Sequence, residues 1–174
     1  MDGYRCFTWD KERFPDPKKM VSDLSNDGFK MMVIIDPGIK NEPGYWVYDQ
    51  GVAGNNFVRY PDGKYFVGKV WPGECVFPDF TKKDAREWWG TLYKGLLDVG
   101  IKGFWNDMNE PAVFDVPGKT FDLSVMHDDR GMKTDHRKNH NVYGMQMARG
   151  TYEGVKKLQP NVRPFVVTRA SYAG

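Results

Sequence analysis

An amphipathic helical pattern followed by a short apolar run recurs three times along the chain. In the first unit, Asp16 is a predicted N-cap with Pro17 at the first helical position, and the helical pattern ends near Gly28. The apolar run that follows, in KMMVIID, is too short for a buried helix and leads into a Pro-Gly turn. We therefore predict a buried strand whose last residue is Asp36.

The second unit repeats this order between Thr81 and Asp107. Its helix is predicted to open at Thr81, with Asp84 three residues later completing a capping box, and to close at Gly100. Apolar residues between these points recur three or four apart, as on one face of a helix. A strand from Gly103 to Trp105 follows and leads into two carboxylates and two amides, of which Asp107 is the first carboxylate.

The third unit combines a helical pattern from Val142 to Leu158 with the apolar run of RPFVVTR, a predicted buried strand that ends at Arg169. Three glycines weaken the helical pattern. Helices that alternate with short, fully apolar strands indicate parallel βα units, so the predicted fold class is α/β. Because three strands make only part of a sheet, we predict an excerpt from a larger α/β protein.

Two long connections separate the three units. Residues 41–80 contain short strand-like patterns and several turn signals, which predict a small β-rich inserted subdomain. Residues 111–137 are predicted to form a polar, solvated loop. A metal site is the alternative for the acidic and histidine residues in and beside this loop, although they lack ligand spacing: His127, Asp128, Asp129, Asp135, His136 and His140.

Composition argues against several classes of protein. The 174 residues carry a net charge of +2 without a basic stripe, so a nucleic-acid partner is not expected. The longest apolar runs have the length of strands, so no membrane span is expected. Cys6 and Cys75 are the only cysteines. Their spacing and the absence of a signal peptide favour two free thiols in a reducing, cytoplasmic compartment.

Each predicted strand delivers a charged residue at its carboxyl end, namely Asp36, Asp107 or Arg169. The carboxyl ends of parallel strands share one edge of a sheet, which carries the site in α/β folds and in (β/α)8 barrels. One such residue alone would more simply cap the following loop, but three in succession favour a shared site. Six Trp residues, in an aromatic fraction of 15%, add flat rings of the kind that pack on sugars.

Carboxylates beside aromatic rings and an arginine suit a reaction with a sugar oxocarbenium-ion transition state. One carboxylate attacks or shields the anomeric carbon, and a second donates a proton to the leaving oxygen. We expect Arg169 to keep a neighbouring Asp ionised. Asp107 and Glu110 are only three residues apart, so we do not expect them to be the catalytic pair. Glu110 either contributes to the site or only bonds backbone amides in the turn at Pro111.

The segment WNDMNEP, from Trp105 to Pro111, resembles the nucleophile signature of glycoside hydrolase family 31, the α-glucosidase family. Further stretches resemble the catalytic barrel of that family in the same order, namely MDGYRCFTWD, VIIDPGI, GKVWPG, FPDF and TRASYAG. The resemblance implies a partial (β/α)8 TIM barrel, from after strand 2 through strand 5, with a β-rich insertion after strand 3. Residues 1–174 would then be part of one catalytic domain.

The resemblance also implies roles for individual residues. Asp107 would be the nucleophile of a retaining mechanism, and Asp36 would accept hydrogen bonds from hydroxyls of the bound sugar. Arg169 would bind the same sugar and steady the nucleophile. Neither a cofactor nor a metal is implied, and the substrate would be an α-glucoside or malto-oligosaccharide. Four further side chains would wall the pocket, namely Trp71, Trp105, Met108 and Phe114.

Parts of the family pattern lie outside this sequence. The family's acid/base Asp falls beyond Gly174, so we expect the chain alone to be inactive and to need the remaining parts of its parent chain to complete the barrel. Two alternatives stay open. One is a non-catalytic sugar-binding relative, and the other is a metal-dependent α/β-barrel enzyme with Asp36, Asp107 and Glu110 as ligands.

Overall fold

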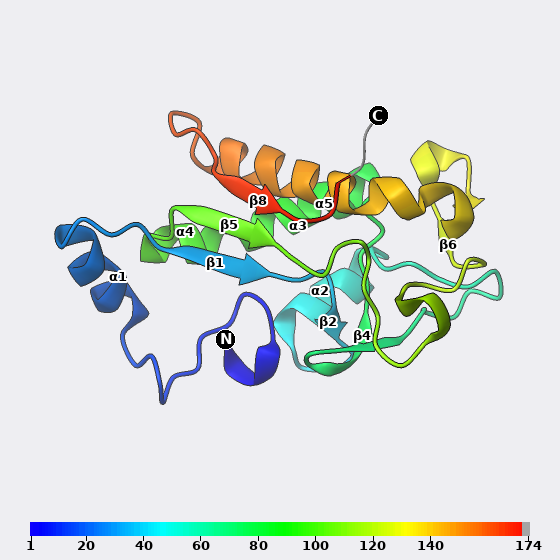
Figure 1. Ribbon diagram of the computed structural model, residues 1–174, viewed down its shortest axis with the longest axis horizontal. Coiled ribbons are helices and arrows are strands. Elements are labelled where there is room, and N and C mark those ends of the chain that lie inside the picture. The colour runs from blue at the N-terminus through cyan, green and yellow to red at the C-terminus, as the bar shows by residue number, and fades with distance from the viewer. Residues whose placement is uncertain (172–174) are drawn as a thin grey trace.

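Three parallel strands form the central sheet of the computed structural model, which describes residues 1–171 (Figure 1). The strands β1 (Met32–Ile35), β5 (Gly103–Asn106) and β8 (Val166–Thr168) lie in the order β1-β5-β8. Ile35 pairs with Asn106, which pairs in turn with Thr168, so all three strands end at one level. The predicted parallel βα arrangement is confirmed.

Helices cover one face of this sheet. The long helix α5 (His136–Leu158) packs on β5 and β8, and α3 (Lys83–Leu92) packs on α5, as Figure 1 shows behind the sheet. A shorter helix, α4 (Lys94–Val99), continues from α3 after a break at Tyr93 and contacts α1 (Pro17–Asn26). None of the helices in residues 1–171 has both the length and the apolar character needed to cross a bilayer.

Two predicted helix ends are confirmed by their capping contacts. The Asp16 side chain accepts a hydrogen bond from the backbone N–H of Lys19 at 2.8 Å, which satisfies an amide in the first turn of α1. Gly100 closes α4 in the left-handed conformation, with φ of 111°. Glycine adopts this conformation without a Cβ clash, so its place in the sequence marks the helix end.

The predicted capping box at Thr81 is wrong. The Thr81 hydroxyl donates to Oδ1 of Asp79 at 2.7 Å. Helix α3 begins after its N-cap Lys82, whose side chain makes no capping hydrogen bond. Asp79 is buried, and a buried carboxylate needs hydrogen-bond donors more than a solvent-exposed helix end does. The tertiary contact therefore overrides the local capping pattern.

The connection at residues 111–137 is more ordered and more buried than the predicted solvated loop. It contains two 3-10 turns, η2 (Pro117–Lys119) and η3 (Asp129–Gly131), and a hairpin of β6 (Met126–His127) and β7 (Thr134–Asp135). His127 and His136 are almost fully buried, so the solvated interpretation is wrong for them. Within residues 1–171, no group of three His, Cys, Asp or Glu side chains is arranged to hold a metal ion.

The inserted segment at residues 41–80 is only partly β-structure, so the prediction of a β-rich subdomain needs correction. A three-stranded antiparallel sheet joins β2 (Ile39–Lys40), β4 (Gly73–Val76) and β3 (Gly68–Val70). The segment YWVYD, however, opens the helix α2 (Trp46–Ala53). The Phe57 ring packs against Gly51 of this helix, and such packing outweighs the strand preference of aromatic and β-branched residues.

The other face of the central sheet is uncovered in residues 1–171, so the predicted buried strands are only half buried. Met32 and Ile34 of β1 are 42% and 40% exposed, and Val167 of β8 also lies open. Alternate residues of a strand point to opposite faces, so this pattern identifies one covered and one open face. In a closed barrel the open face would be the barrel interior.

Glycines let α3 and α5 approach closely. A Cβ added to Gly154 would lie 2.2 Å from the Cα of Gly90, and one added to Gly90 would lie 2.7 Å from the Cα of Gly154. The glycines that weakened the helical pattern of α5 are therefore the positions at which it meets its neighbours. Large aromatic rings fill the surrounding core, including Trp89, Tyr93 and Tyr143.

We predict that Gly154→Ala destabilises the full-length protein, because the new methyl group meets backbone atoms that cannot move aside. Overpacking costs about 1–3 kcal/mol, which exceeds the gain of up to about 1 kcal/mol from replacing a helical glycine. The measurement is the melting temperature by calorimetry. Gly95→Ala in α4 is the matched control, because nothing lies within 4 Å of its added Cβ. Equal melting temperatures for both variants would contradict the close-approach argument.

Candidate active site

Asp107 is held at the carboxyl end of β5 by its own backbone. Its N–H donates to the carbonyl of Ile35 at 3.2 Å, which extends the pairing between β1 and β5 by one residue. Its Oδ1 accepts a hydrogen bond from the N–H of Met108 at 2.9 Å. Met108 adopts a left-handed φ of 55°, which turns the chain sharply away from the strand. These contacts fix where the carboxylate points.

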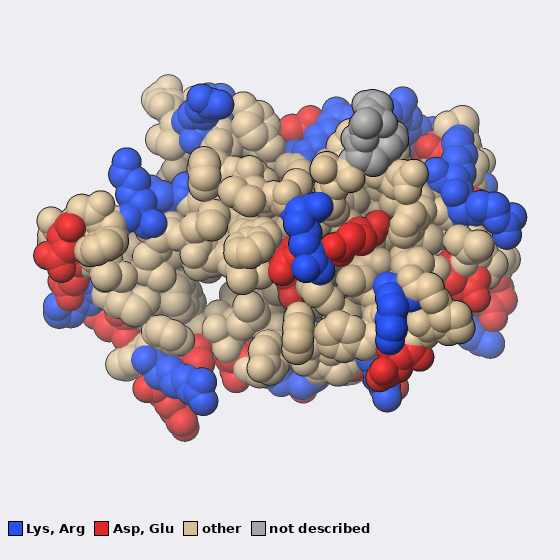
Figure 2. Space-filling model, in the orientation of Figure 1, with Lys and Arg blue, Asp and Glu red and all other residues tan. Residues whose placement is uncertain are grey.

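Arg169 joins the two carboxylates that follow β5. Its Nε lies 2.9 Å from Oδ1 of Asp107 and 2.7 Å from Oε1 of Glu110. Glu110 therefore pairs with Arg169 beside Asp107. Of its two predicted roles, a contribution to the site is supported over bonding only the backbone amides of the turn. Figure 2 shows basic and acidic atoms in contact near the middle of this face, over the carboxyl ends of the strands.

Asp36 stands at the end of β1, next to this ion pair. The side chain is buried, with 9% of the residue exposed, and its Oδ1 has no hydrogen-bond partner among residues 1–171. Burial, the largest cause, and the charge of Asp107 raise the pKa of Asp36 to about 6, although Arg169 partly offsets them. The sheet thus brings together the three strand-end residues that the sequence singled out.

Cys6 is a support for Asp36 that the sequence did not reveal. The Asp36 N–H donates to the Cys6 sulfur at 3.4 Å, and the thiol donates to the Asp36 carbonyl at 3.5 Å. Burial raises the pKa of Cys6 to about 12, so the sulfur stays a thiol. The Tyr45 hydroxyl in turn donates to the Cys6 carbonyl at 2.6 Å. Both cysteines of the chain are free, as predicted.

Buried amides anchor the turn that carries the carboxylates. The Asn109 side chain is fully buried and bonds the Thr168 hydroxyl at 3.1 Å, and Asn106 donates to the Tyr93 hydroxyl at 3.3 Å. Gly144 of α5 makes room for this turn, because a Cβ there would lie 2.5 Å from the Asn109 carbonyl. In the sequence Asn-Asp-Met-Asn-Glu, the amides hold the structure while the carboxylates meet Arg169.

Aromatic side chains from three separate segments lie next to one another. The Trp71 ring, 55% exposed between β3 and β4, meets the edge of Phe114 at 5.1 Å between ring centroids. Tyr4, which the sequence analysis did not single out, stacks on Trp71 at 6.1 Å. The Phe114 N–H donates to the carbonyl of Lys69 at 2.7 Å, which ties the loop after β5 to the inserted sheet. We call Tyr4, Trp71 and Phe114 the aromatic wall.

Trp105 and Met108 lie closer to the strand end than the aromatic wall. The Trp105 ring is half-buried on β5, and its Nε1 is buried without a hydrogen-bond partner among the described residues. Met108 is nearly fully buried, and its sulfur lies 3.7 Å from Nη2 of Arg169. A buried, unpaired N–H is costly, so the Trp105 indole is a donor whose partner is missing from residues 1–171.

The whole chain matches a known protein family. The model for the TIM-barrel domain of glycosyl hydrolases family 31 matches residues 1–174. Alpha-glucosidase 2 of Bacillus thermoamyloliquefaciens is 47% identical over 174 residues, which are 100% of this chain and 22% of that protein. The chain therefore spans about a fifth of the length of this relative.

Two solved structures share its fold. One is the catalytic subunit in the heterodimeric complex of ER glucosidase II, with a TM-score of 0.91 and 38% identity over 100% of this chain and 19% of that chain. The other is a dextranase of Flavobacterium johnsoniae, with a TM-score of 0.85 and 35% identity over 99% of this chain and 21% of that chain. With these matches and the parallel strands described above, the chain belongs to glycosyl hydrolases family 31 and forms part of its TIM-barrel domain.

Proposed function

We propose that the chain is part of a retaining α-glucosidase that releases terminal α-linked glucose from oligosaccharides. The observation that carries the proposal is the contact of Arg169 with Asp107 at 2.9 Å, beside the buried carboxyl group of Asp36. Two carboxyl groups and one guanidinium at a barrel strand edge suit a positively charged sugar transition state. The matched relative named alpha-glucosidase supports this assignment.

Asp107 acts as the nucleophile in this mechanism. Its carboxylate attacks the anomeric carbon as the bond to the leaving oxygen breaks, which forms a covalent glycosyl ester. An acid outside the present sequence donates the proton to the leaving oxygen. A water molecule then cleaves the ester, with the same outside group as general base. Arg169 orients Asp107 for attack through their hydrogen-bonded ion pair.

The sugar is bound by groups that lack partners without it. The unpaired Oδ1 of Asp36 accepts a hydrogen bond from a sugar hydroxyl, and the unpaired Nε1 of Trp105 donates one. Trp71, Phe114 and Met108 supply apolar surface for the C–H face of the ring. The substrate class is an α-glucoside.

The buried free thiols of Cys6 and Cys75 support the expected reducing, cytoplasmic location.

The metal-dependent alternative is disfavoured by the position of Arg169. Its guanidinium already lies within 3 Å of both Asp107 and Glu110, which neutralises the carboxylates that a divalent cation would have to share. The non-catalytic alternative gives Asp107 no covalent bond to form, so a covalent sugar label on Asp107 distinguishes it from the proposal. Both alternatives are separated from the proposal by the following experiment.

We predict that Asp107→Asn lowers kcat of the full-length protein by several orders of magnitude, because an amide cannot form the glycosyl ester. A slow-turnover fluoroglycoside should label the peptide that contains Asp107, as read by mass spectrometry. Glu110→Gln is the matched control, because it changes the other carboxylate of Arg169 and should cost only about tenfold. A label on Asp36 or Glu110, or an Asp107→Asn enzyme within tenfold of wild type, would refute the assignment.

We also predict that Asp36→Asn stabilises the full-length protein at pH 7.5. Because the pKa of Asp36 is about 6 in the folded protein and 3.8 ordinarily, the folded state loses stability as pH rises through this window. Two pKa units correspond to about 3 kcal/mol above pH 6. The melting temperature should therefore rise at pH 7.5 and not at pH 4. Asp84→Asn, an exposed carboxylate in α3, is the control; an unchanged Asp36→Asn melt would contradict the burial argument.

A further inference from the structure

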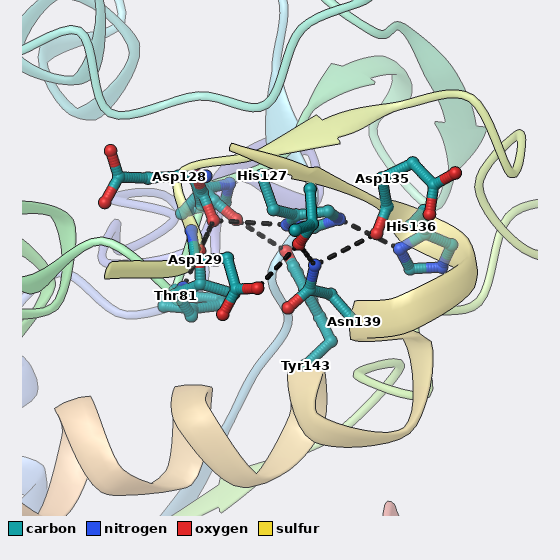
Figure 3. Close-up of polar contacts among 12 residues, drawn as sticks. Thr81, His127, Asp128, Asp129, Asp135, His136, Asn139 and Tyr143 are labelled. Carbon is teal, nitrogen blue, oxygen red and sulfur yellow. Dashed lines mark hydrogen bonds and ion pairs between the residues drawn. The ribbon is translucent and has the colours of Figure 1, made fainter. Parts of the chain in front are cut away.

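The three histidines of the chain form a single file of hydrogen bonds that begins at a buried carboxylate. Figure 3 labels two of them, His127 and His136. Asp79 Oδ1 lies 3.2 Å from His127 Nδ1. His127 Nε2 lies 2.9 Å from His136 Nδ1, and His136 Nε2 lies 3.0 Å from His140 Nδ1. His127 and His136 are 2% and 0% exposed. We call these four residues the histidine chain.

Asp79 fixes the direction of these hydrogen bonds. Its carboxylate accepts from the Asp128 N–H at 2.6 Å and from the Thr81 hydroxyl at 2.7 Å. Burial raises the pKa of Asp79, but the hydrogen bonds from His127, the Asp128 N–H and Thr81 outweigh this effect and lower it. An ionised carboxylate only accepts hydrogen bonds, so His127 Nδ1 must carry a proton.

The direction then propagates through the rings. With its proton on Nδ1, a neutral His127 accepts at Nε2, so His136 must donate from Nδ1. The same step makes His140 donate from Nδ1 to His136 Nε2. Burial is the largest cause that lowers the pKa of His136 well below its ordinary value. His136 therefore stays neutral, and an added proton on its Nε2 would face the N–H of His140.

The histidine chain joins segments that are far apart in the sequence. Asp79 closes the inserted segment, His127 lies on β6, and His136 and His140 lie in the first turns of α5. Tyr143 is a titratable group beside these rings, and its hydroxyl donates to a backbone carbonyl before α3 at 3.0 Å. Lys82, Asp128 and Lys133 line the same pocket as Asp79 and His127. The insertion, the hairpin and the helix are thus held together by one line of hydrogen bonds.

The histidine chain also contacts the loop that carries Phe114. The Phe121 ring packs on His136 at 4.8 Å between ring centroids, and His140 Nδ1, whose proton goes to His136, lies 3.4 Å from the Thr120 hydroxyl. Residues 113–119 close on themselves through the Val113 N–H, which donates to the Lys119 carbonyl at 2.9 Å. The stem of this loop is therefore attached to the histidine chain, while its tip places Phe114 in the aromatic wall.

We propose that the histidine chain, with all three rings neutral and protonated on Nδ1, is a positioning device that holds residues 112–121 and keeps Phe114 against Trp71. Acid releases it, because opening the loop exposes His136, which then binds a proton that it does not accept in the closed state. His136 has a lower pKa when closed than the ordinary 6.5, so the stability of the closed state falls as pH falls below 6.5. The effect on catalysis rests on the proposed function, but the effect on the loop does not.

The first test measures hydrogen exchange of residues 112–121 in the full-length protein. Between pH 7.5 and 5.5 the protection factor in the wild type should fall about tenfold, which is the effect of one group with an open-state pKa of 6.5. His136→Phe should lower the protection at pH 7.5 and remove its pH dependence. His136→Asn keeps a donor and an acceptor, so it should restore part of the protection at pH 7.5. Tyr143→Phe is the control, because it removes a neighbouring buried hydrogen bond but leaves all four residues of the histidine chain in place.

The second test reads the tautomers and the kinetics. Imidazole ¹⁵N shifts at pH 7.5 should show Nδ1–H in His127, His136 and His140, and an Nε2–H ring or a charged His127 would overturn the proposal. With maltose, His136→Phe should raise KM about tenfold and change kcat less, because the loop carries a binding wall and no reacting group. Unchanged loop protection in His136→Phe would also overturn it. Absence of glucosidase activity in the wild type, with the exchange results as expected, would refute only the proposed function.

Discussion

The register of three short parallel strands is the constraint on which the rest of the site depends. Ile35, Asn106 and Thr168 are paired across the sheet, so the next residue of each strand lies at the same level and on the same edge. A slip of one residue in any strand would send its side chain to the opposite face. The ion pair of Arg169 with Asp107 and Glu110 follows from that register. The burial of Asp36 beside this ion pair follows from it as well.

The sequence was sufficient for features that local chemistry determines. The strands follow from short apolar runs, and helix ends follow from Asp16 and Gly100, whose conformational preferences act within a few residues. The convergence of strand-end charges was also predictable, because parallel strands allow only one arrangement of their ends. The aromatic wall was predicted in part, since Trp71 and Phe114 were named and Tyr4 was not.

Features determined by tertiary contacts were not predictable in the same way. The Thr81 hydroxyl bonds a buried carboxylate instead of capping a helix. His127 and His136, which the sequence placed in a solvated loop, are buried in the core. Glu110 looked equally suited to a turn or a site until Arg169, about sixty residues later, was placed beside it. Cys6 had no signal at all, because a thiol that supports a backbone from thirty residues away leaves no local pattern.

The aromatic wall has a separate origin from the charged centre, and this bears on how such a site can diversify. Its rings come from the first residues, from the turn between β3 and β4, and from the loop after β5, none of which is a strand of the parallel sheet. Insertions or substitutions in these segments change the aromatic wall without altering strand register. These segments can therefore vary in shape while the cluster of Asp36, Asp107 and Arg169 stays fixed by the sheet.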